Sequence, residues 1–273
     1  MNIDLHSHSY YSDGVLSPAE LVARAVSKGV TVLALTDHDT VAGIPEALVA
    51  AEGAGLRLIP GVELSCTWNH KTIHILGLNI DPQHKGIQTV VADLKRKREA
   101  RAAQMVNKLI AFGIPGVEES IRQQVKGVPG RSHFAKLLIQ KGYAKNHNSA
   151  FKRFLVKNKP GYVPTQWLSI AEAVEVIRGA GGIAAIAHPR RYNMTMTKLS
   201  EMIEEFAVLG GQAIELATSA QKKDDQLLLY PLLKKHQLYA SIGSDFHEPC
   251  AYNELGKAFF AISPEHVVWD IFS

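Results

Sequence analysis

The chain has 273 residues, of which 46% are hydrophobic and 21% are charged, and this balance excludes a disordered protein. No apolar run approaches the roughly 20 residues that a membrane span needs, which excludes a membrane protein. The two cysteines, Cys66 and Cys250, are too few for a disulfide framework, and the N-terminus has no signal-peptide pattern, so we expect a cytoplasmic protein.

Charge is divided unevenly along the chain, whose net charge is +4. Residues 85–165 contain 17 Lys/Arg and 4 Asp/Glu, a net charge of +13, whereas the remaining residues contain 13 Lys/Arg and 22 Asp/Glu, a net charge of −9. This segregation predicts an acidic body that holds cations and a basic segment that binds polyanions. Two solvated surfaces without a binding role would show the same division.

The first eighty residues predict alternating strands and helices. A helix start is indicated by Ser17 as N-cap, Pro18 in the first turn and Glu20 at the third position, which together form a capping-box pattern. The apolar runs and helical periods predict, in chain order, a strand at 3–5, a helix at 17–29, a strand at 30–35, a helix at about 41–54 and strands at 56–62 and 72–80.

The pattern then becomes helical and basic before strands return. We expect a long helix at about 86–112 and several shorter helices at 117–158, one of them beginning near Gly130. After residue 164 the pattern predicts helices at about 170–179, 197–209 and 222–236 and strands at 183–187, 213–216 and 238–242.

Alternating strands and helices on both sides of a helical segment predict an α/β fold. We interpret the pattern as a βα-barrel formed by residues 1–84 and 166–273, with a basic helical insertion at 85–165 for substrate binding. A doubly wound open sheet is the structural alternative.

Histidines and carboxylates cluster where the predicted strands end. The groups are His6 and His8, Asp37, His38 and Asp39, Glu63, His74, His188, and Asp245 with His247. The carboxyl ends of such strands converge on one face, and divalent metals accept mixed imidazole and carboxylate ligands. The pattern therefore predicts a cluster of two or three metal ions, with Glu63 able to bridge two of them. Taken alone, each motif also has a purely structural interpretation, such as packing of His74 within its strand.

Four motifs in order resemble those of the PHP (polymerase and histidinol phosphatase) family. They are His6-x-His8 with Asp13, Thr36-Asp37-His38-Asp39, His188-Pro189 and Ser244-Asp245-x-His247. The resemblance covers nearly the whole chain. Further stretches are similar to the TrpH-like branch, which includes 3′,5′-nucleotide bisphosphate phosphatases and 5′→3′ exoribonucleases of the RNase AM type: Gly130-Arg131-x-His133, Tyr162-Val163-Pro164 and His188-Pro189-Arg190-Arg191-Tyr192.

The resemblance implies a distorted (β/α)7 barrel (PHP fold) with an inserted helical subdomain and a trinuclear metal site. The implied ligands are His6, His8, Glu63 and Asp245 for one metal, Asp13, His38 and His247 for a second, and Glu63, His74 and His188 for a third. We expect three divalent metals, with manganese preferred and iron or zinc as alternatives. A hydroxide held by these metals would be the nucleophile.

Substrate-binding residues are expected in the insertion and after His188. Arg131 at a helix N-terminus suits a phosphate, although it could instead cap a surface turn. His133 could contact phosphate or pack structurally, and Arg191 is expected to face the site, with Arg190 left as the other possibility. The basic run Lys95, Arg96, Lys97, Arg98 and Arg101 is expected to be a solvated helix face, with guidance of RNA as the alternative.

These observations predict a metal-dependent phosphoesterase, a hydrolase. It would remove the 3′-phosphate of nucleoside 3′,5′-bisphosphates, release mononucleotides from the 5′ end of short 5′-phosphorylated RNA, or both. We expect no membrane association and no obligate protein partner. The alternatives are a histidinol-phosphate phosphatase, a 3′→5′ exonuclease of the polymerase-associated type and a non-catalytic RNA-binding module.

Overall fold

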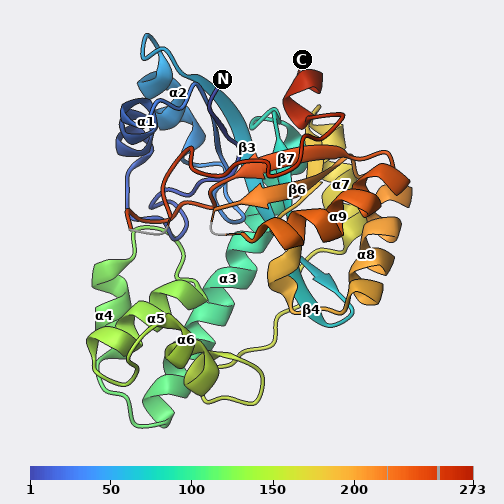
Figure 1. The fold of residues 1–273 in the computed structure, drawn as a ribbon. Coiled ribbons are helices and arrows are strands. Elements are labelled where there is room, and N and C mark those ends of the chain that lie inside the picture. The colour runs from blue at the N-terminus through green and yellow to red at the C-terminus, as the bar shows by residue number, and fades with distance from the viewer. Residues whose placement is uncertain (220, 251–252, 273) are drawn as a thin grey trace.

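The computed structural model describes residues 1–219, 221–250 and 253–272. Seven strands form one sheet in sequence order: β1 (Ile3–Asp4), β2 (Val32–Leu35), β3 (Arg57–Trp68), β4 (Lys71–Leu78), β5 (Ile183–Ile186), β6 (Ala213–Thr218) and β7 (Tyr239–Gly243). The first and last strands meet, because the Leu5 amide donates to the Ile242 carbonyl at 2.9 Å and Ser7 forms a parallel bridge with Phe246. The sheet is thus a nearly closed barrel, as Figure 1 shows, and the predicted fold class is confirmed.

The third strand differs from its prediction. We expected it to end at Val62, but β3 continues to Trp68 and turns at Asn69 and His70 into β4, with which it pairs in antiparallel fashion. Both turn residues have positive φ, 43° and 62°, as a two-residue hairpin requires. Glu63 therefore lies within a strand rather than at its end, and β4 is also antiparallel to β5.

Strand side chains alternate between two apolar layers. Leu33 and Leu35 of β2 pack outward with the helices, whereas Val32 and Ala34 belong to the cluster inside the barrel. In β3, Leu64, Cys66 and Trp68 face the outer layer, so that Glu63 faces the interior. Because side chains continue to alternate between the two layers after residue 62, β3 extends beyond the apolar run at 56–62.

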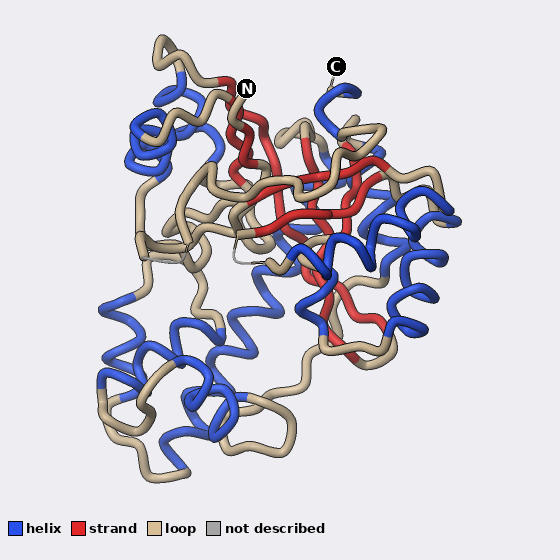
Figure 2. The backbone as a smooth tube through the Cα atoms, in the orientation of Figure 1, coloured by secondary structure: helices blue, strands red, loops and turns tan. Residues whose placement is uncertain are grey.

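Five helices, together with the first part of the long helix of the insertion, supply the outer layer around the sheet (Figure 2). They are α1 (Pro18–Ser27), α2 (Ile44–Ala51), α7 (Ile170–Gly179), α8 (Met196–Val208) and α9 (Lys223–Lys235). The predicted capping box is present, because the Ser17 hydroxyl accepts from the Glu20 amide and the Glu20 carboxylate accepts from the Ser17 amide. Helix α2 starts three residues later than predicted, with Pro45 in its first turn. Short 3₁₀ turns lie at Pro189–Tyr192 and Val268–Ile271.

The insertion forms its own helical layer beside the barrel. It contains α3 (Lys85–Ala111), α4 (Val117–Gln124), α5 (Arg131–Gln140), α6 (His147–Ala150) and a π-helical turn (Phe151–Leu155). A separate apolar cluster extends from Ala102 to Val163. Helix α3 joins both layers, since Ile87 and Leu94 pack into the barrel core and Leu109 into the insertion core. In the described part of the chain, no helix combines the length and apolar character needed to cross a bilayer.

Candidate metal centre and its surroundings

The nine predicted ligands come from seven places in the barrel and lie together. His6 and His8 follow β1, Asp13 lies in the next loop, His38 follows β2, Glu63 and His74 face inward from β3 and β4, His188 follows β5, and Asp245 and His247 follow β7. Potential ligand atoms lie within 4.8 Å of one another in three groups: His8, Asp13, His38 and His247; His6, His8, Glu63 and Asp245; and His38, Glu63 and His74. His188 joins them through Glu63.

The fully buried Glu63 carboxylate lies at the middle of this centre. Its Oε2 atom lies 3.3 Å from His6 Nε2, 3.4 Å from His8 Nε2 and 2.9 Å from His38 Nδ1. Its Oε1 atom lies 2.9 Å from His74 Nδ1 and 3.0 Å from His188 Nε2. The two oxygens therefore face different sets of rings, which is the arrangement that a bridging carboxylate needs.

Several buried atoms that face the centre form no hydrogen bond of good geometry among the described residues, although some lie near each other, such as Glu63 Oε2 and His38 Nδ1 at 2.9 Å. They are His6 Nε2, Asp13 Oδ1, His38 Nδ1, Glu63 Oε2 and His74 Nδ1. A buried polar atom left unpaired costs about 1–3 kcal/mol, and such atoms are rarely gathered in one place. Since all of them are metal-ligating atom types, the residues fit a group of divalent cations.

The protonation states of Glu63, Asp245 and His8 suit cations, whereas, against the effect of burial, Asp13 and Asp245 raise the pKa of His247 to about 10, so a cation that binds there would have to displace the proton of that ring. Burial by itself raises the pKa of Glu63, but His38 and His74 hold it well below its usual range. Burial likewise raises the pKa of Asp245, which His6 and His247 depress well below normal. Burial and His247 lower the pKa of His8 to about 3. At neutral pH the two carboxylates are ionised and the His8 ring is neutral, which are the forms that coordinate metals.

Glu215 of β6 orients two of these histidines. It is buried, its Oε1 lies 3.0 Å from His6 Nδ1, and its Oε2 accepts the backbone N–H of His188 at 2.6 Å. A carboxylate behind a ligating imidazole fixes the ring and its tautomer. The sequence places Glu215 within a predicted apolar strand. Only the structure shows that its side chain points toward His6.

Two aspartates beside His38, Asp37 and Asp39, hold loops rather than the centre. Asp37 accepts from the Ser9 amide at 2.7 Å and from the Ser9 and Ser12 hydroxyls at 2.6 Å each. Asp39 accepts from the Ser65 amide at 2.6 Å and from Arg98 Nε at 2.5 Å. Burial raises the pKa of Asp37 to about 6. Arg98 thus connects the insertion to the strand that contains Glu63.

The structure distinguishes the two arginines that the sequence left open. Arg191 Nη1 donates to Asp245, and its side chain lines a cavity together with His74 and His188. Arg190 points to α9, where its Nε donates to Asp225 at 2.8 Å. Arg191 is therefore the one that faces the centre.

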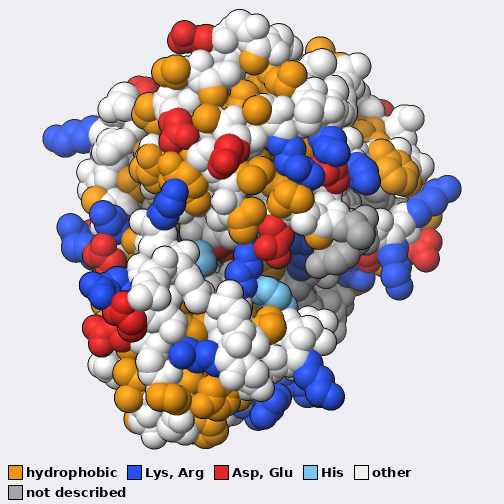
Figure 3. Space-filling view, turned by 90° about the vertical axis from the view of Figure 1, so that its left-hand side faces the viewer, with side chains coloured by type: hydrophobic (Ala, Val, Ile, Leu, Met, Phe, Trp, Pro, Cys, Tyr) orange, Lys and Arg blue, Asp and Glu red, His pale blue; other side chains and the backbone are white. Residues whose placement is uncertain are grey.

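Arg131 lies in the same cavity, which has a volume of about 540 Å³, and so does Arg101. Burial lowers the pKa of Arg101 to about 9, with Arg131 and Arg98 adding to the shift, and its Nε has no hydrogen-bond partner among the described residues. Like charges gathered without a carboxylate partner form a site for an anion. The face seen in Figure 3 shows histidines in a hollow, with Lys and Arg side chains beside them.

The position of Arg101 differs from its prediction, which grouped this residue with a solvated basic run. A signal was available in the sequence: Arg98 and Arg101 continue the helical stripe of Leu94 and Met105, both of which are buried. Both guanidinium groups lie over the ring of Trp167, at 5.4 and 5.5 Å from its centroid, and so face inward with that stripe.

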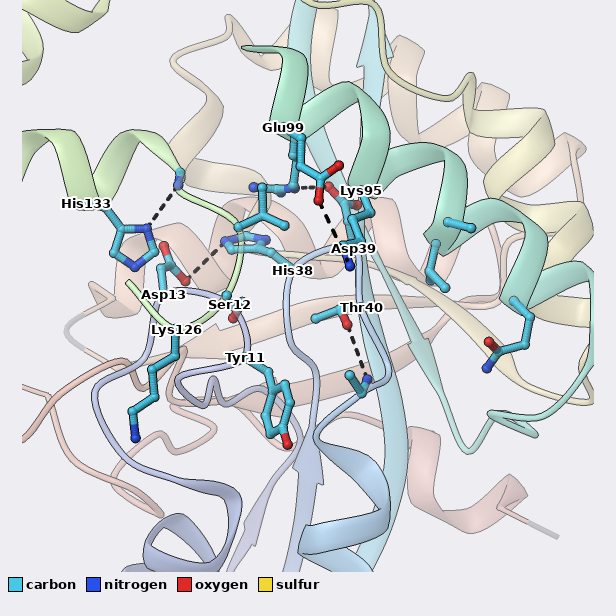
Figure 4. A pocket seen from close by; sticks show the side chains of 18 residues that line it. Tyr11, Ser12, Asp13, His38, Asp39, Thr40, Lys95, Glu99, Lys126 and His133 are labelled. Atoms are coloured by element: carbon cyan, nitrogen blue, oxygen red, sulfur yellow. Dashed lines mark hydrogen bonds and ion pairs between the residues drawn. The ribbon is translucent and has the colours of Figure 1, made fainter. Parts of the chain in front are cut away.

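His133 lies in a different cavity from Arg131, beside Asp13 and His38 (Figure 4). Its Nδ1 accepts the Gly130 amide at 2.9 Å, which caps the first turn of α5. Burial lowers its pKa to about 4, so the ring is neutral at physiological pH. The three predicted substrate residues are thus distributed over more than one cavity around the centre.

Known proteins resemble this chain over nearly its full length. It is 45% identical over 269 residues to a 5′-3′ exoribonuclease of Haemophilus influenzae, with 98% of each chain covered. It is 42% identical over 250 residues to a 3′,5′-nucleoside bisphosphate phosphatase of Chromobacterium violaceum, covering 91% of this chain and 88% of the other.

Solved structures share the fold. An amidohydrolase from Chromobacterium violaceum, with sulfate bound and no metal, superimposes with a TM-score of 0.94 at 39% identity, covering 99% of this chain and 95% of that one. A metal-dependent phosphoesterase from Bifidobacterium adolescentis gives a TM-score of 0.85 at 29% identity, covering 94% and 92%. The model of the PHP domain matches residues 4–219. The chain belongs to the PHP domain family.

Proposed function

We propose that this protein hydrolyses phosphoesters of nucleotides that carry a 5′-phosphate. It would remove the 3′-phosphate of nucleoside 3′,5′-bisphosphates and release mononucleotides from the 5′ end of RNA. The observation behind this proposal is the arginine cavity, lined by Arg101, Arg131 and Arg191, which adjoins the centre at His74 and His188. The names of the exoribonuclease and the bisphosphate phosphatase, and of the metal-dependent phosphoesterase, support a hydrolase that acts on phosphoester bonds.

The enzyme depends on divalent metals, and we propose three per chain, with manganese preferred and iron or zinc as alternatives. The proposed ligand sets are His6, His8, Glu63 and Asp245; Asp13, His38 and His247; and Glu63, His74 and His188. When bound, such ions supply positive charge that activates water and offsets the charge developing on a phosphoryl group.

The chain's own residues would select and orient the substrate. Arg131 offers a guanidinium at the N-terminus of α5, where free amides and the helix dipole also favour an anion. Arg101 adds a second guanidinium, and Arg191 lies between this cavity and Asp245. In this assignment Arg101 and Arg131 bind the 5′-phosphate, and Arg191 contacts the phosphate that is hydrolysed.

One site can act on both kinds of substrate because both present the same two phosphates. In a 3′,5′-bisphosphate and in the first nucleotide of 5′-phosphorylated RNA, one ribose separates the 5′-phosphate from the 3′-phosphoester. Either substrate then places its scissile phosphate at the same distance from the anchor. We further propose a cytoplasmic location, which suits the two free thiols, Cys66 and Cys250.

The test compares adenosine 3′,5′-bisphosphate, 5′-phosphorylated RNA and their 5′-hydroxyl counterparts in the presence of Mn²⁺. We expect turnover of both 5′-phosphorylated substrates and release of nucleoside 5′-monophosphate from each, with much lower kcat/KM for the 5′-hydroxyl forms. Equal rates with and without the 5′-phosphate would contradict the proposal. Faster turnover of histidinol phosphate, or degradation of RNA from its 3′ end, would favour an alternative.

A further inference from the structure

A second cavity opens beside the proposed metal centre, and the function proposed above does not use it. Its volume is about 580 Å³, within the usual range for ligand sites, and its lining includes Asp13 and His38 (Figure 4). It shares no lining residue with the arginine cavity, which borders the centre at His74 and His188. The centre therefore borders both of these cavities, and a third, smaller one of about 350 Å³ borders it at Asp13, Asp245 and His247.

One wall of this cavity is a single face of α3. Gln88, Val91, Lys95 and Glu99 line it at spacings of three or four residues, which places them on the same side of the helix. The basic run of α3 is thus divided: Lys95 and Arg98 line this cavity, whereas Arg101 lines the other one.

The opposite wall consists of two loops that approach each other closely. The barrel loop contributes Tyr11 and Ser12, and the loop before α5 contributes Lys126 and Gly127. A Cβ atom on Gly127 would lie 2.4 Å from the backbone oxygen of Tyr11, so only glycine allows the insertion to approach the barrel this closely. The cavity is therefore built jointly by the barrel and the insertion.

Tyr11 and Lys126 line this wall, and Tyr10, which does not line the cavity, contacts both of them. The rings of Tyr10 and Tyr11 stack with centroids 5.0 Å apart, and Lys126 Nζ lies 4.3 Å from the centroid of Tyr10. Within the described residues, no carboxylate lies at ion-pair distance from Lys126, and the exposed Lys95 is 4.0 Å from an exposed Glu99. A lysine without a carboxylate partner, Lys126, and a second lysine in an exposed and therefore weak ion pair, Lys95, lie near an aromatic ring that can stack on a base, and this combination binds single-stranded nucleic acid.

We infer that this second cavity binds the nucleotides that follow the scissile phosphate of an RNA substrate. The inference rests on the proposed function and extends it. A 3′,5′-bisphosphate ends at the phosphate that is hydrolysed and has nothing to place in the cavity, whereas an RNA chain continues beyond the centre and needs a path. Interactions with Lys95, Lys126 and Tyr11 would then favour RNA over the bisphosphate.

The lysines are tested with the double variant Lys95→Ala/Lys126→Ala. We expect the ratio of kcat/KM for 5′-phosphorylated RNA to kcat/KM for adenosine 3′,5′-bisphosphate to fall about tenfold. The salt dependence of RNA turnover should also decrease, by a slope of about 0.7 for each phosphate that is no longer neutralised. Lys141→Ala/Lys145→Ala is the matched control, because it removes the same charge from exposed positions of the insertion outside both cavities. In this control the ratio should stay at the wild-type value.

The aromatic interaction is tested with Tyr11→Leu, which keeps bulk and removes the ring. In this single variant, loss of stacking on one base predicts that the ratio of kcat/KM for RNA to kcat/KM for the bisphosphate falls about tenfold relative to the wild type. Binding of fluorescent 5′-phosphorylated RNA is measured in parallel with the metals chelated, so that the readout does not depend on hydrolysis. Both variants should weaken binding of a four-nucleotide RNA more than binding of the mononucleotide.

An unchanged ratio in both variants, or equal losses on the two substrates, would overturn the inference. Failure of the wild-type protein to hydrolyse either substrate would instead contradict the proposed function. In that case the binding measurement decides the inference by itself, and length-independent binding in the wild type would overturn it.

Discussion

The barrel centre and the basic face of the insertion hold their charged groups in different ways. In the barrel, each group is fixed by partners: Glu63 faces five histidines, and Glu215 holds His6 and the backbone of His188. In the insertion, Arg101 and Arg131 rest on the rings of Trp167 and Phe151, and no carboxylate among the described residues pairs with them. The difference suggests that the two regions have separate roles: the barrel positions the groups of the metal centre, and the insertion binds and selects the substrate.

The largest expected effect is at the middle of the barrel centre. Glu63→Gln removes the negative charge that faces five histidines, and we expect turnover to fall by more than about a hundredfold, since even residues behind metal ligands change activity 10–100-fold. Metal content, measured by elemental analysis, should fall as well. Glu201→Gln on the exposed face of α8 is the matched control and should retain wild-type turnover and metal content. A fully active, metal-loaded Glu63→Gln protein would contradict our assignment of the centre.

The connection between the two regions is tested by Arg98→Ala. It leaves Asp39, which is 1% exposed, without its ionic partner, and breaking a buried pair costs about 3–5 kcal/mol. We expect the free energy of unfolding, measured by urea denaturation, to decrease by an amount of this order. The double variant with Asp39→Asn should recover part of the loss. A decrease no larger than that of exposed Arg96→Ala would show that the two regions are not coupled through this pair.

The selectivity of the insertion is tested by Arg101→Ala. Loss of one charge-assisted hydrogen bond with phosphate, worth about 1.5–3 kcal/mol, predicts a decrease of roughly ten- to a hundredfold in kcat/KM on 5′-phosphorylated substrates. The 5′-hydroxyl substrates should change much less, because they lack the phosphate that Arg101 is proposed to bind. Arg122→Ala, which removes an exposed arginine of the same insertion, provides the control. Equal losses on both substrate classes would contradict the anchoring role.

The smallest effect is expected far from both sites, at the start of α1. Ser17→Ala removes the hydroxyl that accepts from the Glu20 amide, and loss of such a cap costs about 1 kcal/mol of stability. The midpoint temperature of thermal unfolding should decrease slightly, while turnover of both substrates and metal content stay unchanged. A change in substrate preference would show that the division between the two regions is less sharp than the structure suggests.

The sequence was a good guide to the barrel because strand periodicity and loop motifs are local. It predicted the order of the elements, and the resemblance to the PHP family implied the nine groups that lie together at the centre. It missed the length of β3 because the turn at Asn69 and His70 is not a typical hairpin sequence, although Leu64, Cys66 and Trp68 alternate with other residues as a strand requires.

The sequence could not show which cavity each substrate-binding side chain lines, because this depends on how the insertion packs against the barrel. His133 and Arg131 are two residues apart on α5, yet they line different cavities. The sequence favoured Arg191 over Arg190 as the arginine that faces the site, but it did not show the contact that orients Arg191, with Asp245, which is 54 residues away. Such arrangements arise from tertiary packing, and no local pattern encodes them.

Helix α3 has a mechanical consequence. Its 27 residues form one continuous helix, about 40 Å long, that is anchored at one end in the barrel and at the other in the insertion. Because both ends of α3 are packed, we expect Arg101 to keep a constant distance from the histidines of the centre. Substrates would then be selected by the spacing of their phosphates. A ligand whose two phosphates lie farther apart than one ribose allows would contact either the proposed 5′-phosphate site at Arg101 or the metal centre, but not both.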